Sequence, residues 1–144
     1  MNKLQGKHIF IVEDNPQNRV IYQVMFLRRS AIVEFERWGN GTVNKLRNLP
    51  SVDVIIMDLM LASGASGFEI LQEIRQQEKF ATVPVVAVSA ADPSTTLTRC
   101  IEAGFSGFIP KPIDTDRFPD LIVRIIEGDK IWLLSSVSAE TASP

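Results

Sequence analysis

The sequence predicts an α/β fold of the doubly wound type, in which one parallel sheet is covered by helices on both faces. Two observations predict it. Five short apolar runs rich in Ile, Val and Phe follow one another along the chain, and stretches with helical periodicity separate them, joined by short connections. With 144 residues and a hydrophobic content of 45%, the chain falls in the size range of one domain with its own core.

Each apolar run is expected to form a strand. The runs cover residues 8–12, 31–35, 52–57, 83–89 and 107–110. Because strand and helix alternate five times, the strands are expected to run parallel. In the flavodoxin-like strand order, 2-1-3-4-5, the first and third strands are neighbours, and ligands bind beyond the carboxyl ends of the strands near that point. Functional residues are therefore to be sought at the five strand ends.

Five helices are expected to follow the strands, at about residues 16–30, 42–49, 66–75, 92–104 and 114–128. In the first, Val20, Val24 and Leu27 share one face at helical spacing. The third is followed by a polar run, residues 76–79, that is expected to be a solvated helix end. The fourth opens at Asp92-Pro93, an N-cap followed by proline at the first helical position. The fifth is expected to bury four residues: Phe118, Leu121, Ile122 and Ile125.

The domain is expected to span residues 1–128, with a partly disordered C-terminal extension over residues 129–144. Within the extension, residues 129–134 either lengthen the last helix or pack across the domain, and the pattern leaves both alternatives open. Trp132 in this segment is either a surface anchor or a packing residue. Residues 135–144 are rich in Ser, Ala and Thr, as in a frayed tail. No attached output domain is expected.

Charge and composition exclude several classes of function. The chain carries 15 Lys and Arg against 17 Asp and Glu, a formal charge of -2, so nothing draws it generally to nucleic acid or anionic lipid. A single cysteine, Cys100, excludes a disulfide framework. Neither a signal peptide nor a membrane-spanning run is recognised. A cytoplasmic protein is expected.

Polar side chains stand at four strand ends. Glu13 and Asp14 follow the first strand, Asp58 ends the third, Ser89 ends the fourth and Lys111 follows the fifth. Carboxylates crowded at one sheet edge repel each other, and a hard divalent cation such as Mg²⁺ is the simplest reason for them. Beside that cation, Asp58 is suited to act as a carboxylate nucleophile on phosphorus.

Four motifs at these strand ends resemble those of receiver domains of two-component response regulators, of the single-domain, chemotaxis-regulator-like kind. The resemblance covers about residues 7–127 and rests on the motifs IVEDN at 11–15, VIIMDLM at 54–60, VVAVSA at 85–90 and FIPKP at 108–112. Each motif is weak alone, but four in the right order at strand ends are specific together. The resemblance implies a signalling protein that is switched by phosphorylation, not an enzyme that turns over substrate.

The resemblance also implies a metal site. Asp14 would ligate Mg²⁺, or Mn²⁺ in its place, directly, and Glu13 would do so largely through water. Asp58 would be the phosphoacceptor and a metal ligand, and the backbone carbonyl of Met60 would complete the protein's ligands.

For the phosphoryl group, the resemblance implies contacts to Ser89, to the backbone of Ala90 and to Lys111. The Lys111–Pro112 peptide bond would be cis, an arrangement that occurs almost exclusively before proline. Ser89 and Phe108 would form the switch: the hydroxyl moves towards the new phosphoryl oxygen, and the ring fills the space beside the fourth strand.

Partners follow from the same resemblance. A sensor histidine kinase or a histidine phosphotransfer protein would donate the phosphoryl group. A downstream protein would read the face formed by the fourth helix, fifth strand and fifth helix, and a homodimer on that face is left open. No nucleic acid or membrane partner is expected.

The chain departs from the family's pattern at two places. The loop at residues 61–67 lacks a proline usual after the phosphoacceptor and is one residue longer, which predicts a more mobile rim. The positions two residues beyond Asp58 and Ser89, which best orient an attacking water, hold Met60 and Ala91. Neither side chain offers a hydrogen bond, so slow loss of the phosphoryl group is expected.

Two other functions compete with this interpretation. A phosphoaspartate hydrolase of the haloacid-dehalogenase type also uses an Asp after a strand, but it needs an acid where Met60 stands. A receiver-like module that binds partners without phosphorylation would not need the complete set of acids, hydroxyl and lysine. A beryllofluoride experiment would separate these alternatives.

Overall fold

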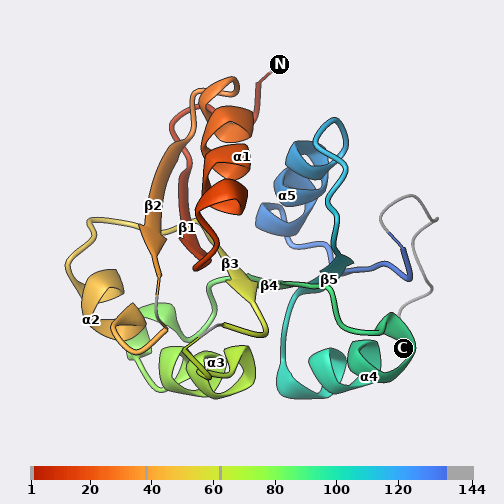
Figure 1. Ribbon diagram of the computed structural model, residues 1–144. Helices are drawn as coiled ribbons and strands as arrows, with labels where there is room; N and C mark the ends of the chain where they lie inside the picture. Colours follow the sequence, from red (N-terminus) through yellow and green to blue (C-terminus); the bar gives the residue numbers. More distant parts are fainter. Residues whose placement is uncertain (1, 38, 62, 136–144) are drawn as a thin grey trace.

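The computed structural model describes residues 2–37, 39–61 and 63–135 of the chain (Figure 1). One sheet runs through the centre, with α1 and α5 on one face and α2, α3 and α4 on the other (Figure 1). In chain order the elements are β1 (His8–Val12), α1 (Pro16–Leu27), β2 (Ile32–Glu36), α2 (Thr42–Arg47), β3 (Val54–Asp58), α3 (Gly67–Arg75), the 3-10 turn η1 (Glu78–Phe80), β4 (Val85–Ser89), α4 (Pro93–Ala103), β5 (Gly107–Pro110), α5 (Phe118–Ile126) and β6 (Ile131–Trp132).

The sheet has the order β2-β1-β3-β4-β5-β6, and every neighbouring pair is parallel. The predicted flavodoxin-like order is confirmed for the first five strands. The predicted number of strands was wrong by one, because β6 adds to the edge of β5. A two-residue strand carries no periodicity of its own, and only its pairing with β5 makes it recognisable.

The formation of β6 decides between the two arrangements that were left open for residues 129–134. Of the two alternatives, the structure shows this segment packed against the domain, since Ile131, Trp132 and Leu133 are all buried. Trp132 is accordingly a packing residue. The division of the chain after residue 128 stays a prediction, and most of the expected tail, residues 136–144, lies outside the described residues.

Two apolar cores flank the sheet, because successive strand residues point to opposite faces. On β3, Val54 and Ile56 belong to the core under α1 and α5, whereas Ile55 and Met57 belong to the core under α2, α3 and α4. All five residues of β3 are buried. The sheet is therefore covered on both faces at its centre, as predicted.

The face that α1 buries differs from the one suggested by its periodicity. The stripe of Val20, Val24 and Leu27 is 45–69% exposed, and the buried face carries Tyr22 and Phe26 instead. The rings of Tyr22, Phe26 and Phe118 of α5 pack with centroids 5.9–6.4 Å apart. The helix has two apolar faces, and the aromatic one, which removes more area from water, is buried.

Helix ends agree with the predicted caps in part. Asp92 caps α4 by accepting a hydrogen bond from the Ser94 amide at 3.0 Å, and Gly104 ends it with φ of 96°. Three helices are shorter than predicted, since α1 ends at Leu27, α2 ends at Arg47 and α5 begins at Phe118. The polar run after α3 overlaps the turn η1, whose last residue, Phe80, is buried. Within the part of the chain that the structure describes, no helix combines the length and the apolar character needed to cross a bilayer.

Candidate functional site

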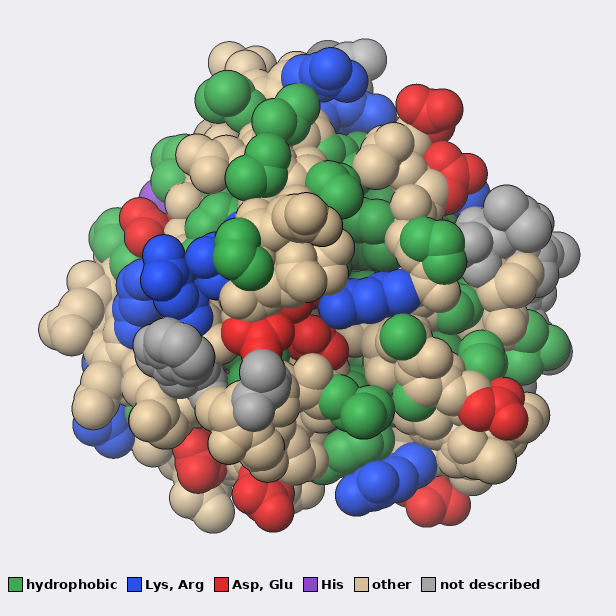
Figure 2. Space-filling view, in the orientation of Figure 1, with side chains coloured by type: hydrophobic (Ala, Val, Ile, Leu, Met, Phe, Trp, Pro, Cys, Tyr) green, Lys and Arg blue, Asp and Glu red, His purple; other side chains and the backbone are tan. Residues whose placement is uncertain are grey.

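The carboxyl ends of the central strands bring the predicted polar residues to one edge of the sheet. Glu13 and Asp14 follow β1, Asp58 is the last residue of β3, Ser89 ends β4 and Lys111 follows β5. Figure 2 shows acidic side chains gathered in a central hollow of this face, with a basic side chain lying directly beside them. The sequence assigned these residues to separate strand ends, and the parallel sheet makes them neighbours.

Three carboxylates form the centre of the site. One oxygen from each of Glu13, Asp14 and Asp58 lies within 4.8 Å of the other two. Glu13 is 1% exposed and Asp58 is 7% exposed, so the mutual repulsion of their charges is poorly screened by water. A set of oxygen donors this close together fits a hard divalent cation such as Mg²⁺.

Lys111 supplies the opposite charge. Its Nζ lies 3.0 Å from Oε1 of Glu13 and 3.3 Å from Oδ2 of Asp58. Burial lowers the pKa of Lys111, but the charges of Asp58 and Glu13 outweigh that effect and leave this pKa above its usual value. Lys111 is therefore a permanent cation at the centre of the site.

The carboxyl group of Asp58 is held in an unusual electrostatic state. The pKa of Asp58 is raised to about 6, because burial, the largest cause, and the neighbouring Glu13 raise it more than the Lys111 charge and a hydrogen bond from the Met60 amide lower it. That hydrogen bond runs from the Met60 amide to Oδ1 at 3.1 Å. One Asp58 oxygen is thus held by the backbone and the other by Lys111, and a further cation would stabilise the ionised form.

The β1–α1 turn holds Glu13 in place through residues that the sequence analysis missed. Glu13 accepts hydrogen bonds from the Asn15 amide at 3.2 Å and from Nδ2 of Asn18 at 3.3 Å. Arg19 Nη1 donates to the backbone carbonyls of Glu13 at 3.3 Å and of Asp14 at 3.0 Å. The signal was available, because the first turn of a helix that follows β1 must lie over the same sheet edge.

The loop after Asp58 returns towards the strand end. The Gly67 amide donates to the carbonyl of Leu59 at 3.1 Å, and Met60 forms a β-bridge with Ser66. A Cβ on Gly67 would lie 3.0 Å from the carbonyl oxygen of Asp58, so glycine allows this close approach. The Met60 side chain is 70% exposed at the rim. The predicted metal-binding role of its carbonyl stays a prediction, as does the predicted mobility of the rim.

The ends of β4 and β5 are tied together beside the acids. Ser89 is 1% exposed, and its hydroxyl accepts a hydrogen bond from the Ala91 amide at 3.0 Å. Its carbonyl accepts one from the Lys111 amide at 2.9 Å. The Lys111–Pro112 bond is cis, as the resemblance implied. Ala90 is exposed at the site, whereas Phe108 is fully buried. The roles of Ser89, Ala90 and Phe108 in binding and switching stay predictions.

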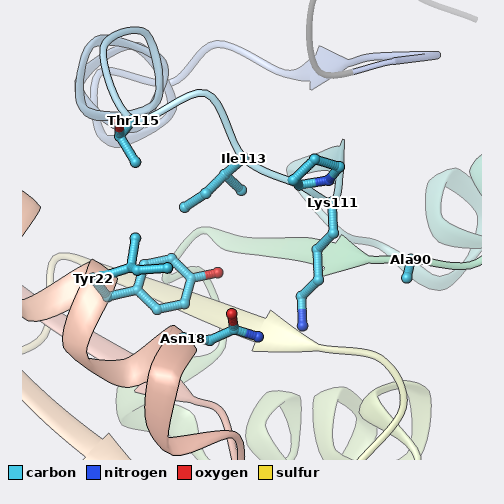
Figure 3. Close-up of a pocket in the computed structure, with 8 residues that line it drawn as sticks. Asn18, Tyr22, Ala90, Lys111, Ile113 and Thr115 are labelled. Atoms are coloured by element: carbon cyan, nitrogen blue, oxygen red, sulfur yellow. The ribbon is translucent and has the colours of Figure 1, made fainter.

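A cavity of about 330 Å³ opens next to Lys111, between α1 and the β5–α5 connection (Figure 3). Asn18, Tyr22 and Ile113 are among the residues that line it, and the Lys111 side chain extends from the far side towards Asn18 (Figure 3). Burial, followed by the charges of Glu13 and Asp58, raises the pKa of Tyr22, so its hydroxyl stays neutral. The sequence analysis did not identify this cavity.

Comparisons with known proteins find relatives in two-component signalling. Among relatives, the chain is 28% identical to the probable histidine kinase 6 of Oryza sativa subsp. japonica, over 88% of this chain and 15% of that protein. It is 25% identical to the two-component response regulator ORR5 of the same plant, over 83% of this chain and 88% of that protein. The chain thus spans a small part of one relative and most of the other.

Solved structures show the same architecture. The receiver domain of the sensor histidine kinase PA1611 from Pseudomonas aeruginosa, solved with a magnesium ion coordinated in its active-site cleft, is 28% identical, with a TM-score of 0.76 over 85% of this chain and 99% of that one. The chemotaxis response regulator CheY4 of Vibrio cholerae has a TM-score of 0.76 over 84% of this chain and 99% of that one, at 19% identity, which shows the fold alone.

A family model also matches most of the chain. The model of the response regulator receiver domain matches residues 9–123, which include every strand from β1 to β5 apart from the first residue of β1, and all the residues of the site. The fold, the acidic cluster and the lysine at the end of β5 agree with that match. The chain therefore belongs to the response regulator receiver domain family of two-component signalling systems.

Proposed function

We propose that Asp58 accepts a phosphoryl group from a histidine kinase or a histidine phosphotransfer protein, and that the chain relays this event through a change of its partner-binding face. The observation that carries the proposal is the convergence of Glu13, Asp14 and Lys111 on Asp58. In the reaction, an Asp58 oxygen forms a bond to phosphorus while the phosphorus–nitrogen bond of the donor phosphohistidine breaks. The donor imidazole keeps the electron pair and takes up a proton.

The acidic cluster fits a resident Mg²⁺, with Mn²⁺ as an alternative. Glu13, Asp14, Asp58 and the carbonyl of Met60 would hold the ion, which when bound neutralises the carboxylates and the charge on the phosphoryl oxygens. The magnesium ion in the PA1611 receiver supports this assignment. Lys111 would act together with the ion, since its ammonium already contacts Asp58 and can exchange that contact for one to a phosphoryl oxygen.

Ser89 and the backbone of Ala90 complete the binding of the phosphoryl group. The Ser89 hydroxyl is buried at the end of β4 and must give up the hydrogen bond from the Ala91 amide, or share it, to turn towards a phosphoryl oxygen. Such a turn leaves space beside β4 on the face where Phe108 lies. The pair would then act as the switch.

The proposed role is that of a regulatory phosphoacceptor, not a turnover enzyme. A hydrolase of the aspartyl type needs an acid or base two residues beyond its nucleophile, and Met60 offers neither. Met60 and Ala91 both line the hollow at the rim of the site. Since neither side chain can orient a water molecule, we expect the phosphoryl group to be lost slowly.

The phosphodonor would dock on α1. Helix α1 flanks the site and carries an exposed apolar stripe on its surface (Figure 2). The stripe consists of Val20, Ile21, Val24 and Leu27. A groove bordered by Ile21, Val24 and Pro119 continues from this stripe towards the β5–α5 connection. Exposed apolar patches next to a reactive group indicate a protein partner. The downstream partner would use the α4–β5–α5 face, where a homodimer is also an option, and the proposed location is the cytoplasm.

Labelling of the full chain tests the proposal. Incubation with radiolabelled acetyl phosphate and Mg²⁺ is expected to leave an acid-stable, hydroxylamine-labile label on the wild type and none on Asp58→Asn. Asp116→Asn, an exposed acid on the β5–α5 connection, is the matched control and is expected to label like the wild type. A wild-type chain that stays unlabelled by acetyl phosphate and by a histidine kinase would contradict the proposed function.

A further inference from the structure

The edge of the sheet beyond β5 is occupied by the chain's own C-terminal segment. The amide of Ile131 donates to the carbonyl of Ser106 at 3.1 Å, and the amide of Leu133 donates to the carbonyl of Phe108 at 3.0 Å. The side chains of β6 reach both faces of the sheet, since Ile131 and Leu133 join the core under α5 while Trp132 joins the core under α4. This segment is thus an integral edge strand.

The fit between β5 and β6 is close. A Cβ placed on Gly107 would lie 2.8 Å from the carbonyl oxygen of Ile131, nearer than atoms of these kinds approach in folded proteins. Only glycine therefore permits this pairing without a shift of one strand. The turn before β6 is held as well, because Gly128 adopts φ of 110° and Arg124 Nε lies 3.0 Å from Oδ2 of Asp129.

Trp132 lies next to the proposed switch residue. In the register of the sheet, Phe108 has Ala87 of β4 as its neighbour on one side and Trp132 of β6 on the other. Register partners in parallel strands point to the same face, and all three residues belong to the core under α4. Phe108 is 0% exposed and Trp132 is 2% exposed. A ring that moved from the Ser89 side towards the edge would meet the indole.

We propose that Trp132 is a positioning residue for the switch, which holds Phe108 buried beside β4 and so favours the arrangement that binds a phosphoryl group. This inference rests on the proposed function of Asp58 and Ser89. Outward movement of Phe108 requires β6 to loosen, so the docking of β6 and the occupancy of Asp58 are coupled. Because such coupling is reciprocal, the phosphorylated state holds β6 more tightly, and docked β6 raises the affinity for the phosphoryl group by the same factor.

A consequence concerns the partner face. A protein that binds the α4–β5–α5 face would contact β6, because β6 lies at the edge of the sheet beyond β5. Leu134, two residues beyond that strand, is 54% exposed. The outermost strand on this side is therefore β6, and phosphorylation changes how firmly β6 is docked on β5.

Beryllofluoride, which mimics a phosphoryl group on Asp58, tests the coupling in the full chain with Mg²⁺. Trp132→Ala is expected to weaken the apparent affinity for beryllofluoride about fivefold or more, as measured by fluorine NMR titration. Trp132→Phe keeps a flat apolar ring next to Phe108 and is expected to restore most of the affinity. The matched control is Ile122→Ala, which removes a fully buried side chain from the opposite core and is expected to leave the affinity unchanged.

The results distinguish a failure of this inference from a failure of the proposed function. Equal affinities of Trp132→Ala and wild type, or an equal loss in Ile122→Ala, would overturn the inference while the proposed function stands. A wild type that does not bind beryllofluoride would overturn the proposed function, and this inference with it. Hydrogen exchange of the wild type is a second test that needs no variant: the Leu133 amide is expected to exchange more slowly with beryllofluoride bound, and an unchanged rate would overturn the coupling.

Discussion

Replacement of Asp58 by Asn is expected to stabilise the metal-free fold at pH 8. The pKa of Asp58 is raised from 3.8 to about 6, chiefly by burial, so the folded chain holds the Asp58 proton more tightly than the unfolded chain does. The stabilising effect of that proton is present at low pH and is lost as the pH rises from about 4 through about 6. Above that range the fold contains a carboxylate that would be better solvated in the unfolded chain.

The size of the effect follows from that difference in pKa. At about 1.4 kcal/mol for each pKa unit, the ionised Asp58 costs the fold up to about 3 kcal/mol. The Asp58→Asn variant removes this cost but also removes one of the two ion pairs of Lys111, whose contact with Glu13 at 3.0 Å persists. We therefore expect a net gain of about 1–3 kcal/mol at pH 8, and little difference at pH 4.

Urea unfolding in EDTA, followed by circular dichroism at pH 4, 6 and 8, measures this difference. The free energy of unfolding of Asp58→Asn minus that of the wild type is expected to grow with pH. Asp116→Asn, the exposed control, is expected to change stability by less than about 0.5 kcal/mol at any pH. An Asp58→Asn variant that is no more stable than the wild type at pH 8, or a gap that does not vary with pH, would refute the reasoning.

The remaining predictions concern the metal, the phosphoryl group and the donor. Saturating Mg²⁺ is expected to raise the free energy of unfolding of the wild type by about 1–3 kcal/mol in urea and that of Asp58→Asn by less; equal gains would argue against the metal site. Lys111→Met is expected to slow labelling by acetyl phosphate about tenfold or more, and an unchanged rate would exclude its role. The double change Met60→Asn and Ala91→Glu is expected to speed loss of the label about tenfold, whereas an unchanged half-life would contradict our account of slow decay. Val24→Glu on α1 is expected to slow transfer from a histidine kinase about tenfold but not labelling by acetyl phosphate; slowing of both would argue against a docking role.

Much of the fold could be predicted because its signals are local. Strands in a doubly covered parallel sheet are continuous apolar runs, and those at residues 8–12 and 107–110 were located to the residue. Helix starts with a side-chain cap, such as Asp92 before α4, were equally clear. Where such a signal is missing, the predicted helices were too long, as at the end of α1 and the start of α5.

The chemistry of the site was also predictable, because the residue types stand at strand ends and the strand order brings those ends together. Glu13, Asp14, Asp58 and Lys111 needed only the parallel sheet to become neighbours. The supporting hydrogen bonds from Asn18 and Arg19 were not predicted. Asn18 donates to the Glu13 carboxylate and Arg19 donates to the backbone carbonyls of Glu13 and Asp14, both from the first turn of α1 beside this edge of the sheet.

The sequence by itself determined the alternation of five strands with five helices and the position of the acids and the lysine at strand ends, and thereby the kind of chemistry, because these depend on periodicity and on residue type. Only the tertiary structure decided which face α1 buries, since the stripe of Val20, Val24 and Leu27 lies on the surface and Tyr22 and Phe26 pack against Phe118 instead. The tertiary structure alone also decided that Trp132 closes the sheet beside Phe108. A two-residue strand forms because its neighbour supplies hydrogen bonds and buries its side chains, and neither contribution can be predicted from two residues of sequence.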